Sequence, residues 1–262
     1  MVELIQSKST PSSTVFFLII MNYLALATDF DGTLATDGMV EESTLNALER
    51  WQQSGRKLIL ITGRQLDNLI AHIPVINVFD WVIAENGAVL YQPPTKLEKL
   101  LAERPSEDFI SLLRDRIDQK QQSLKNQAVP EEFSQIAQAQ LFEALGVGRV
   151  IIATWEPYLE ITQKTIQELG VNLQIICNKG AVMVLPEGIN KAFGLNALSQ
   201  LINLPLQQIV GVGDAENDCD FLEQCGYSVA VANALPQVKE KVNWVTKNSR
   251  GAGVIELINH LL

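Results

Sequence analysis

Short apolar runs alternate with helix-like segments along this chain, and that alternation limits the folds it can adopt. Residues 23–28 and 57–62 have the length and composition of buried strands. Between them, Leu45, Leu48 and Trp51 recur at helical spacing on one face. Strands that alternate with helices pair in parallel and carry helices on both faces of their sheet. We therefore predict an α/β fold with a doubly wound, Rossmann-like parallel-sheet core.

The alternation resumes after the second strand and again in the C-terminal quarter. A helix from Arg64 to about His72 is expected before a strand in the apolar run at 81–91. The elements expected near the C-terminus are a strand at 207–214, a helix to Cys225, a strand at 227–234, a short helix opened by Pro236 and a last helix after residues 251–253. Both ends of the chain thus contribute strands to one sheet.

The middle of the chain departs from this rhythm and is predicted to be an insertion. Expected strands at 149–155 and 173–178 flank a helix, and 181–188 leads back toward the core. Proline and glycine stand at the two crossings, near Gln92 to Pro94 and near Pro186 to Gly188, where we expect hinges. The predicted organisation is an N-terminal extension at 1–20, a core at 21–88 and 186–262, and an inserted α+β cap domain at 89–185.

Length, charge and cysteine usage exclude several classes of protein. The chain has 262 residues, 47% of them hydrophobic, and a net charge of -10. It is long enough to bury a full core, and it lacks the basic excess typical of nucleic-acid-binding proteins. Three cysteines without CxxC spacing indicate free thiols in a reducing compartment, so we expect a cytoplasmic protein. The apolar run at 13–21 is too short to span a bilayer, and no membrane partner is expected.

Asp29 and Asp31 follow the first apolar run directly and precede a Gly-Thr turn. An Asp-x-Asp-Gly sequence is often an ordinary solvated turn. A calcium loop starts the same way but needs Glu at its twelfth position, which here is Val40. Ligands of open α/β sheets gather at the carboxyl ends of strands, so the alternative to a turn is a chemical site. With only two histidines in the chain, metal chemistry at such a site would use oxygen ligands.

Other polar side chains are expected at the same edge of the sheet. Thr62 ends the second strand, Asp214 and Asp218 follow a later strand, and Lys191 begins the helix after the insertion. In a parallel sheet the carboxyl ends of the strands lie along one edge. Crowded carboxylates repel each other unless a cation joins them, and Mg2+ favours carboxylate, water and phosphate oxygens. A lysine, a hydroxyl and backbone amides can hold a phosphate, so the set predicts phosphoryl transfer.

Four motifs follow one another along the chain: DFDGTLA at 29–35, ITGR at 61–64, NKAFGLNAL at 190–198 and GDAENDCDF at 213–221. In this order they resemble the motifs of the haloacid dehalogenase superfamily, whose phosphatases use an aspartate nucleophile. Together with ENGA at 85–88, their order and spacing resemble the Cof-type phosphatases, which carry an α/β cap. The resemblance extends from about Tyr23 to the C-terminus and matches the insertion by position more than by residues.

The resemblance implies a role for each motif residue. The expected catalytic residues are Asp29 as the nucleophile that forms an aspartyl-phosphate, Asp31 as the general acid and base, and Thr62 and Lys191 as phosphate clamps. The expected phosphate-binding residues are Thr62, Gly63, Lys191 and Asn217. The expected ligands of Mg2+ are Asp29, the backbone carbonyl of Asp31, Asp214, and Asp218 directly or through water.

The resemblance also bears on the reaction. Dehalogenases of the superfamily lack the second aspartate, so Asp31 favours a phosphatase or a phosphomutase. The short interval between Asp31 and Gly63 leaves no room for the helical cap usual in the mutases. We predict a Mg2+-dependent phosphatase for a small phosphorylated metabolite, with a sugar phosphate or phosphoglycolate as first guesses. A phosphomutase, and a regulatory or binding protein that retains the phosphatase core, are the alternatives, and the oligomeric state is left open.

Three further residues have two interpretations each. Arg64 either reaches the site or lies on the surface as the first residue of a helix. Lys179 and Trp155, in the insertion, either contact the substrate or are a solvated lysine and a packed tryptophan, the commoner roles of these residue types.

Overall fold

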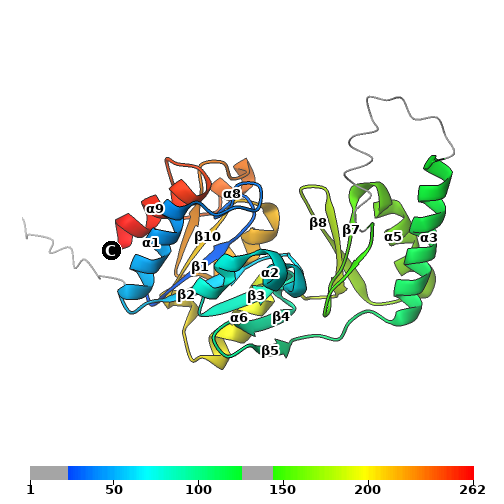
Figure 1. Cartoon of the computed structure of the whole chain (residues 1–262), viewed down its shortest axis with the longest axis horizontal. Helices are drawn as coiled ribbons and strands as arrows, with labels where there is room; N and C mark the ends of the chain where they lie inside the picture. Colours follow the sequence, from blue (N-terminus) through cyan, green and yellow to red (C-terminus); the bar gives the residue numbers. More distant parts are fainter. Residues whose placement is uncertain (1–22, 126–143) are drawn as a thin grey trace, which may run out of the picture.

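The computed structural model describes residues 23–125 and 144–262, and the predicted extension at 1–20 lies outside them. Within the described residues the chain forms two units, one built on an eight-stranded sheet and the other on a four-stranded sheet (Figure 1). The larger unit is the core, and the smaller unit is the insertion.

Parallel pairing dominates the large sheet, as the alternation of strands and helices predicts. The strand order is β12-β11-β10-β1-β2-β3-β4-β5, and β1 pairs in parallel with both β2 and β10. The parallel strands are β1 (Ala25–Asp29), β2 (Lys57–Ile61), β3 (Trp81–Ala84), β10 (Ile209–Gly213), β11 (Tyr227–Ala230) and β12 (Trp244–Val245). The antiparallel strands are β4 (Val89–Gln92) and β5 (Leu97–Leu100).

Helices cover both faces of this sheet. Leu58 and Leu60 of β2 pack into one apolar cluster and Ile59 and Ile61 into another, because successive strand residues point to opposite faces. The first cluster includes residues of α1 (Glu42–Gln53), α2 (Leu66–His72) and α9 (Arg250–Leu261), and the second includes residues of α6 (Lys191–Leu201), α7 (Cys219–Gln224) and α8 (Pro236–Lys239). The predicted doubly wound α/β core is confirmed.

The insertion is an antiparallel sheet with helices packed against it. Its strand order is β6-β7-β9-β8, with β6 (Gly146–Val147), β7 (Ile152–Trp155), β8 (Leu173–Asn178) and β9 (Ala181–Pro186). Helices α3 (Glu107–Lys125) and α5 (Leu159–Leu169) lie on the side of this sheet that faces away from the core (Figure 1). Phe109 and Leu113 of α3 pack there on Ile152 and Val184 of the strands. The predicted inserted α+β unit is therefore confirmed.

The apolar run at 81–91 forms two strands rather than the single strand expected. The chain reverses at Glu85–Gly87, and β4 returns antiparallel to β3. Asn86 has a φ of 55° and Gly87 a φ of 105°, which lie in the left-handed region that favours glycine and asparagine. The reversal is thus made by local backbone conformations that the apolar pattern hides.

The insertion also begins later than residue 89. β5 pairs with β4 through a tight turn in which Thr95 N donates to Gln92 O at 3.2 Å. Both strands belong to the large sheet, and the chain leaves that sheet only after Leu100. The hinge expected near Gln92 to Pro94 is therefore wrong, since a turn between two paired strands cannot swing a unit. β9 ends at Pro186, so the second crossing lies where it was expected, and a hinge there stays a prediction.

The last helix begins earlier than expected. α9 starts at Arg250 and includes Gly251 and Gly253. A Cβ atom at Gly251 would collide with Thr44 Oγ1 of α1, so the small residue allows the two helices to pack closely. The short edge strand β12 was not expected at all. Short 3₁₀ helices within the described residues are η1 (Pro74–Val78), η2 (Glu85–Gly87), η3 (Glu156–Tyr158), η4 (Leu206–Gln208) and η5 (Glu216–Asp218).

The topology brings the motif residues to one edge of the core sheet. β1 ends at Asp29, β2 runs into Thr62, and β10 runs into Asp214. The turn between β8 and β9 of the insertion approaches the same edge at Lys179. Of the helices in 23–125 and 144–262, none is long and apolar enough to cross a membrane.

Candidate active site

Lys191 and Asp29 form a buried ion pair at the carboxyl end of β1. Asp29 is the last residue of that strand, and Lys191 is the first residue of α6, whose N-cap Asn190 accepts a hydrogen bond from Phe193 N. Lys191 Nζ lies 2.6 Å from Asp29 Oδ1 and 2.6 Å from Asp218 Oδ1. All three charged side chains are buried. Since a charge removed from water needs a partner, this pairing ties three distant segments together.

Asp214 and Asp218 complete an acidic cluster around that lysine. Asp218 Oδ2 accepts hydrogen bonds from the backbone N–H groups of Asp214 and Ala215, both at 2.9 Å. Asp214 Oδ1 accepts a hydrogen bond from Thr33 Oγ1 at 3.1 Å. Carboxylate oxygens of Asp29, Asp214 and Asp218 lie within 4.8 Å of one another, so the cluster can hold a metal ion.

Burial and mutual repulsion act on the protonation of this cluster. Burial, and then the charges of Asp218 and Asp214, raise the pKa of Asp29 to about 7, although Lys191 works in the opposite direction. Burial opposes the charge of Lys191, but the carboxylates of Asp218 and Asp29 outweigh it and raise the pKa of Lys191. Burial also raises the pKa of Asp214. The three carboxylates outnumber the two lysines that pair with them, Lys191 and Lys179, which is a condition that favours a bound cation.

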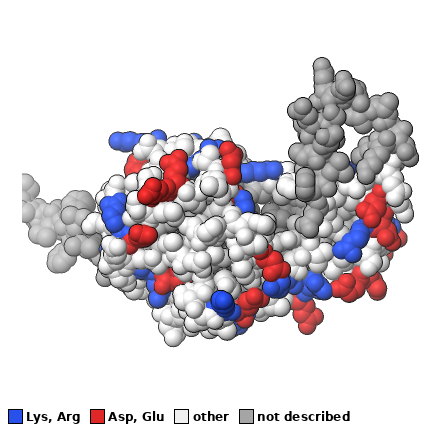
Figure 2. Space-filling view, viewed as in Figure 1, with Lys and Arg blue, Asp and Glu red and all other residues white. Residues whose placement is uncertain are grey.

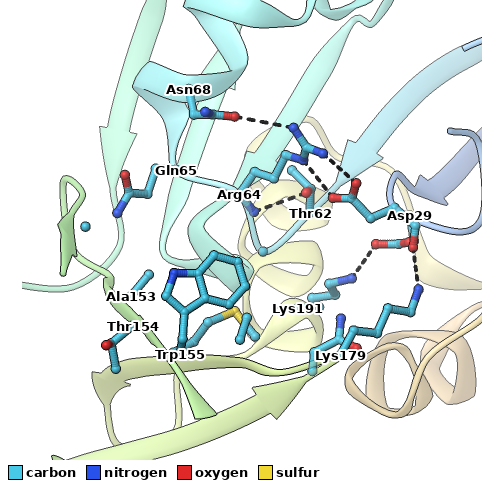
Figure 3. Close-up of a pocket in the computed structure, with 16 residues that line it drawn as sticks. Asp29, Thr62, Arg64, Gln65, Asn68, Ala153, Thr154, Trp155, Lys179 and Lys191 are labelled. Carbon is cyan, nitrogen blue, oxygen red and sulfur yellow. Dashed lines mark hydrogen bonds and ion pairs between the residues drawn. The ribbon is translucent and has the colours of Figure 1, made fainter. Parts of the chain in front are cut away.

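The donor set fits a hard divalent cation. All the expected donors are oxygen atoms, which are the ligands that Mg2+ prefers. A cation of the chain already lies against two of them, because Lys179 Nζ is 2.7 Å from the carbonyl oxygen of Asp31 and 2.9 Å from Asp214 Oδ2. Figure 3 shows Lys179 and Lys191 extending toward this acidic edge. The oxygens are therefore arranged to receive positive charge, and the identity of the metal as Mg2+ stays a prediction.

The Asp31 carboxylate is held by Arg64. Arg64 Nε donates to Asp31 Oδ2 and Arg64 Nη2 donates to Asp31 Oδ1, each at 2.7 Å. The guanidinium also lies over the ring of Phe30, 5.1 Å from its centroid. The hydrogen bond with Asp31 raises the pKa of Arg64. The Asp31 side chain is 40% exposed, unlike the buried Asp29, and Arg64 reaches the site rather than standing apart on the surface.

The expected phosphate-binding residues fall into two groups. Thr62, Gly63 and Lys191 line a cavity above Asp29. Thr62 Oγ1 accepts a hydrogen bond from Arg64 N at 3.1 Å, so its hydroxyl hydrogen is available to another acceptor. Asn217 is instead paired with a neighbouring amide, since its Nδ2 donates to Asn86 Oδ1 at 3.2 Å. Its contact with a phosphate stays a prediction.

The cavity has a volume of about 510 Å3 and lies between the core and the insertion (Figure 3). The core forms its floor with Asp29 and one wall with Arg64. The insertion forms the opposite side with Thr154, Trp155 and Lys179. Trp155 is 40% exposed, so it is a wall of this cavity rather than a packed core residue. A volume of this size suits a small molecule.

Sequence reasoning missed two contributors to the acidic cluster. Thr33 lies within the first motif, and its position four residues after Asp29 is the signal that places it near the end of β1. Lys179 was considered only as a substrate contact or a solvated side chain, and its contacts with Asp31 and Asp214 were not foreseen. The signal for its location is the Lys-Gly pair between two apolar strands, which is typical of a hairpin turn.

This arrangement agrees with the comparison to known families. The family model of haloacid dehalogenase-like hydrolases matches this chain over residues 26–124 and 106–258. The matched ranges cover most of the chain, both the core and the insertion. The chain therefore belongs to the haloacid dehalogenase-like hydrolase family, and the prediction of that family is confirmed.

Individual relatives extend over the same length. The chain is 26% identical over 242 residues to a phosphoglycolate phosphatase of Methanothermobacter thermautotrophicus, covering 91% of this chain and 98% of that protein. It is 24% identical over 259 residues to the 5-amino-6-(5-phospho-D-ribitylamino)uracil phosphatase YitU of Bacillus subtilis, covering 89% and 95%. The solved structure of the subclass IIB sugar phosphatase BT4131 superimposes with a TM-score of 0.64 at 20% identity, covering 91% of this chain and 99% of that one. This likeness shows that the two chains share a fold.

Proposed function

We propose that this protein is a Mg2+-dependent phosphatase that hydrolyses a small phosphorylated metabolite through an aspartyl-phosphate on Asp29. The observation that carries the proposal is the buried Asp29 carboxylate at the floor of the cavity, held 2.6 Å from Lys191 Nζ. A carboxylate that is paired with a lysine, and that opens onto a cavity for a small molecule, is suited to nucleophilic attack.

Asp29 and Asp31 have different surroundings, and this supports different roles. Lys191 holds Asp29 Oδ1, so Oδ2 is the atom expected to attack the phosphorus as the bond to the leaving oxygen breaks. The more exposed Asp31 would give a proton to the leaving oxygen and then take one from the water that attacks the aspartyl-phosphate. Hydrolysis of the acyl phosphate releases phosphate and regenerates the Asp29 carboxylate.

Lys191, Thr62 and the backbone at Gly63 are expected to hold the phosphoryl oxygens. The ammonium group of Lys191 would also reduce the repulsion between Asp29 and an incoming phosphate. The expected metal ligands are Asp29, the Asp31 carbonyl and Asp214, with Asp218 acting directly or through water. When bound there, Mg2+ would supply positive charge that stabilises the transferred phosphoryl group.

The substrate is expected to be a small phosphate ester, with phosphoglycolate or a sugar phosphate as the first candidates. Relatives named as phosphatases of phosphoglycolate and of a phosphorylated ribitylaminouracil cover about nine-tenths of the chain. The core motifs read only the phosphoryl group, so selectivity for the rest of the molecule is assigned to the insertion, through Thr154, Trp155 and their neighbours in the cavity wall. No nucleic acid is expected as a partner, and acidic and basic side chains are interspersed on the face seen in Figure 2.

The same proposal includes a cytoplasmic location. Cys177, Cys219 and Cys225 are all free thiols in the structure, as expected for a protein of a reducing compartment.

The test is hydrolysis of p-nitrophenyl phosphate, followed by a panel of phosphorylated metabolites. We expect Asp29→Asn to fold and to lose turnover by more than about a thousandfold, or 4 kcal/mol of barrier, because an amide is no nucleophile. Asp37→Asn is the control, since Asp37 is an exposed carboxylate in the following loop with a φ of 51° that asparagine tolerates. Turnover by Asp29→Asn within tenfold of the wild type would refute the nucleophile.

The metal is tested separately on the wild-type protein. Excess chelator should abolish activity, and Mg2+ should restore it. Ca2+ should inhibit, because it favours a higher coordination number and longer bonds to oxygen. Full activity in excess chelator would contradict the metal assignment while leaving the nucleophile in place.

A further inference from the structure

Lys179 belongs to the insertion, yet its ammonium group lies in the acidic cluster of the core. It is the first residue of a two-residue turn, since Asn178 and Ala181 form the last pair of β8 and β9. Lys179 has a φ of 49° and Gly180 a φ of 84°, as in the turns that prefer Asn-Gly. A positive φ is unfavourable for lysine compared with asparagine or glycine. Unlike those residues, however, lysine has a side chain long enough to reach the core from this turn.

The ammonium group of Lys179 makes two short hydrogen bonds to oxygen atoms of the core. Its Nζ donates to the Asp31 carbonyl oxygen at 2.7 Å and to Asp214 Oδ2 at 2.9 Å. The Asp214 side chain is only 5% exposed, so the ammonium covers a buried charge. Gly32 makes room for this approach, because a Cβ atom there would lie 2.5 Å from both Lys179 Nζ and Asp214 Oδ2.

We propose that Lys179 competes with the divalent cation for these two oxygens, so that metal binding displaces the turn of the insertion from the core. The inference rests on the metal site of the proposed function. A Mg2+ ion bound by the Asp31 carbonyl and by Asp214 would lie about 2.1 Å from each oxygen. An ammonium nitrogen bound to the same two oxygens would then lie next to the metal, and the two positive charges would repel each other. The lone pairs of these oxygens would also have to bind both the metal and the ammonium group.

The same turn also borders a second cavity, which offers a place for the displaced side chain. This cavity of about 360 Å3 is lined by Asn178, Lys179 and Gly180 themselves and by the carboxylate residues Glu156 and Glu216. Both glutamates are exposed and belong to segments that flank the turn. The displaced ammonium group of Lys179 would therefore find other carboxylates, those of Glu156 and Glu216, at the cavity that Lys179 already lines.

The consequence is a link between metal loading and the position of the insertion. Without metal, Lys179 neutralises part of the acidic cluster and ties the β8–β9 turn to Asp31 and Asp214. With metal, the cation takes over those oxygens, and the turn that forms one side of the cavity is released. The metal-free protein thereby carries its own occupant of the metal site, which lowers the affinity for the metal.

The variant that isolates this effect is Lys179→Asn. Asparagine before glycine is the preferred sequence of such a turn, so the fold of the hairpin should be kept, while the shorter side chain cannot reach the core. Lys179→Met is a second variant that keeps the length of the side chain without its charge. Arg250→Met is the control for a general loss of positive charge. Arg250 Nη1 lies 3.5 Å from Thr36 Oγ1, in the loop after Asp31. Like Lys179, Arg250 has a positive φ, here 52°.

The measurement is direct binding of Mn2+, followed by the electron paramagnetic resonance signal of the free ion. We expect Lys179→Asn and Lys179→Met to bind Mn2+ at least about tenfold more tightly than the wild type, or 1.4 kcal/mol, and Arg250→Met to stay within about twofold. Equal affinities of wild type and Lys179 variants would overturn the competition, and so would an equal gain in Arg250→Met. If none of the proteins binds Mn2+, the metal site itself is wrong and the competition falls with it.

A second readout follows Lys179 in the wild-type protein. Acetylation of its amino group by a water-soluble acetylating reagent, quantified by mass spectrometry, should be faster with Mg2+ than in chelator, because metal binding releases the amine from the cluster. Lys164 is the internal reference, since it pairs with Glu160 on the exposed surface of α5. Equal acetylation of Lys179 with and without Mg2+, in a protein that binds Mn2+, would show that the turn is not displaced.

Discussion

Lys191 Nζ lies 2.6 Å from Asp29 Oδ1, and both side chains are buried between β1 and α6. The same ammonium group reaches Asp218 Oδ1 at 2.6 Å, so one lysine compensates two carboxylates from opposite ends of the chain. Removal of a charge from such a cluster leaves the others buried without a partner, which costs more than the net contribution of the pair. Lys191 is therefore placed to serve the stability of the core as well as the expected chemistry.

The first prediction is that Lys191→Met loses stability as well as activity. We expect the free energy of unfolding to fall by about 3–5 kcal/mol, because two buried carboxylates lose their cation. The measurement is urea denaturation of the metal-free protein. Lys241→Met is the control, since Lys241 pairs with Glu223 in an exposed ion pair at 3.0 Å, and it should change stability by less than about 1 kcal/mol. Similar stability of both variants would mean that Lys191 contributes no more than a surface charge.

The second prediction concerns pH and the metal-free protein. The pKa of Asp29 is about 7 in the folded state against 3.8 for an ordinary aspartate, so the folded state binds this proton more tightly. The stability gained from protonation is present at low pH and is lost as the pH rises from about 4 through 7, by up to about 1.4 kcal/mol per pH unit. Asp29→Asn cannot titrate there, so the difference between its melting temperature and that of the wild type should shift in favour of the variant as the pH rises from 5 to 8 in chelator. A difference in melting temperature between the two proteins that stays constant across this pH range would contradict the raised pKa.

The convergence of the motif residues was predictable from the sequence because it depends on a general property of parallel sheets. Asp29, Thr62 and Asp214 each end an apolar run, and parallel pairing of those runs brings their ends to one edge. Lys191 was placed correctly because Asn190 is a favourable N-cap, which fixes the start of α6. In these cases local sequence signals and sheet topology lead to the same arrangement.

Two other features were not predicted from the sequence, for different reasons. The reversal at Glu85–Gly87 follows from positive φ angles at three consecutive residues, while the surrounding apolar run reads as one strand. The contact of Lys179 with Asp31 joins residues 148 positions apart and depends on how the insertion sits on the core. The sequence indicates the turn that carries Lys179, and only the tertiary structure shows where its side chain ends.

The third prediction assigns Arg64 a positioning role for Asp31. Its guanidinium makes two hydrogen bonds of 2.7 Å to that carboxylate, a fork that a lysine cannot reproduce. Arg64→Lys should lower kcat by about tenfold, or 1.4 kcal/mol of barrier, while Mn2+ affinity stays within about twofold. The second readout separates positioning of Asp31 from damage to the metal cluster. Arg50→Lys, which alters an exposed hydrogen bond to Asn259, is the control and should keep the wild-type kcat. An unchanged kcat in Arg64→Lys would show that catalysis does not depend on the paired hydrogen bonds from Arg64 to Asp31.

Glu85 of the core attaches the insertion through hydrogen bonds from backbone N–H groups to its carboxylate. Its buried carboxylate accepts hydrogen bonds from four backbone N–H groups, those of Leu66, Arg149, Val150 and Ile151, at distances from 2.7 to 3.3 Å. Three of these donors belong to one stretch of the insertion, just before β7. Arg149 adds an exposed ion pair to Asp67 of the core at 2.6 Å and one to Glu98 at 3.2 Å. The ENGA motif thus holds the base of the insertion through Glu85.

The last prediction is that Glu85→Gln weakens this attachment without touching the expected catalytic residues. The amide keeps one oxygen but turns the other acceptor into a donor, so at least one backbone N–H group at 149–151 is left facing another donor. A buried hydrogen bond to a charged acceptor is lost and a donor stays unsatisfied, which should lower the free energy of unfolding by roughly 3 kcal/mol. Hydrogen exchange at residues 149–151 should accelerate more than exchange in β1 or β10, because the loss is local to the attachment. Glu98→Gln removes the exposed partner of the same Arg149 and should change stability by less than about 1 kcal/mol. If Glu85→Gln matches Glu98→Gln in both measurements, the four hydrogen bonds of Glu85 do not hold the insertion in place.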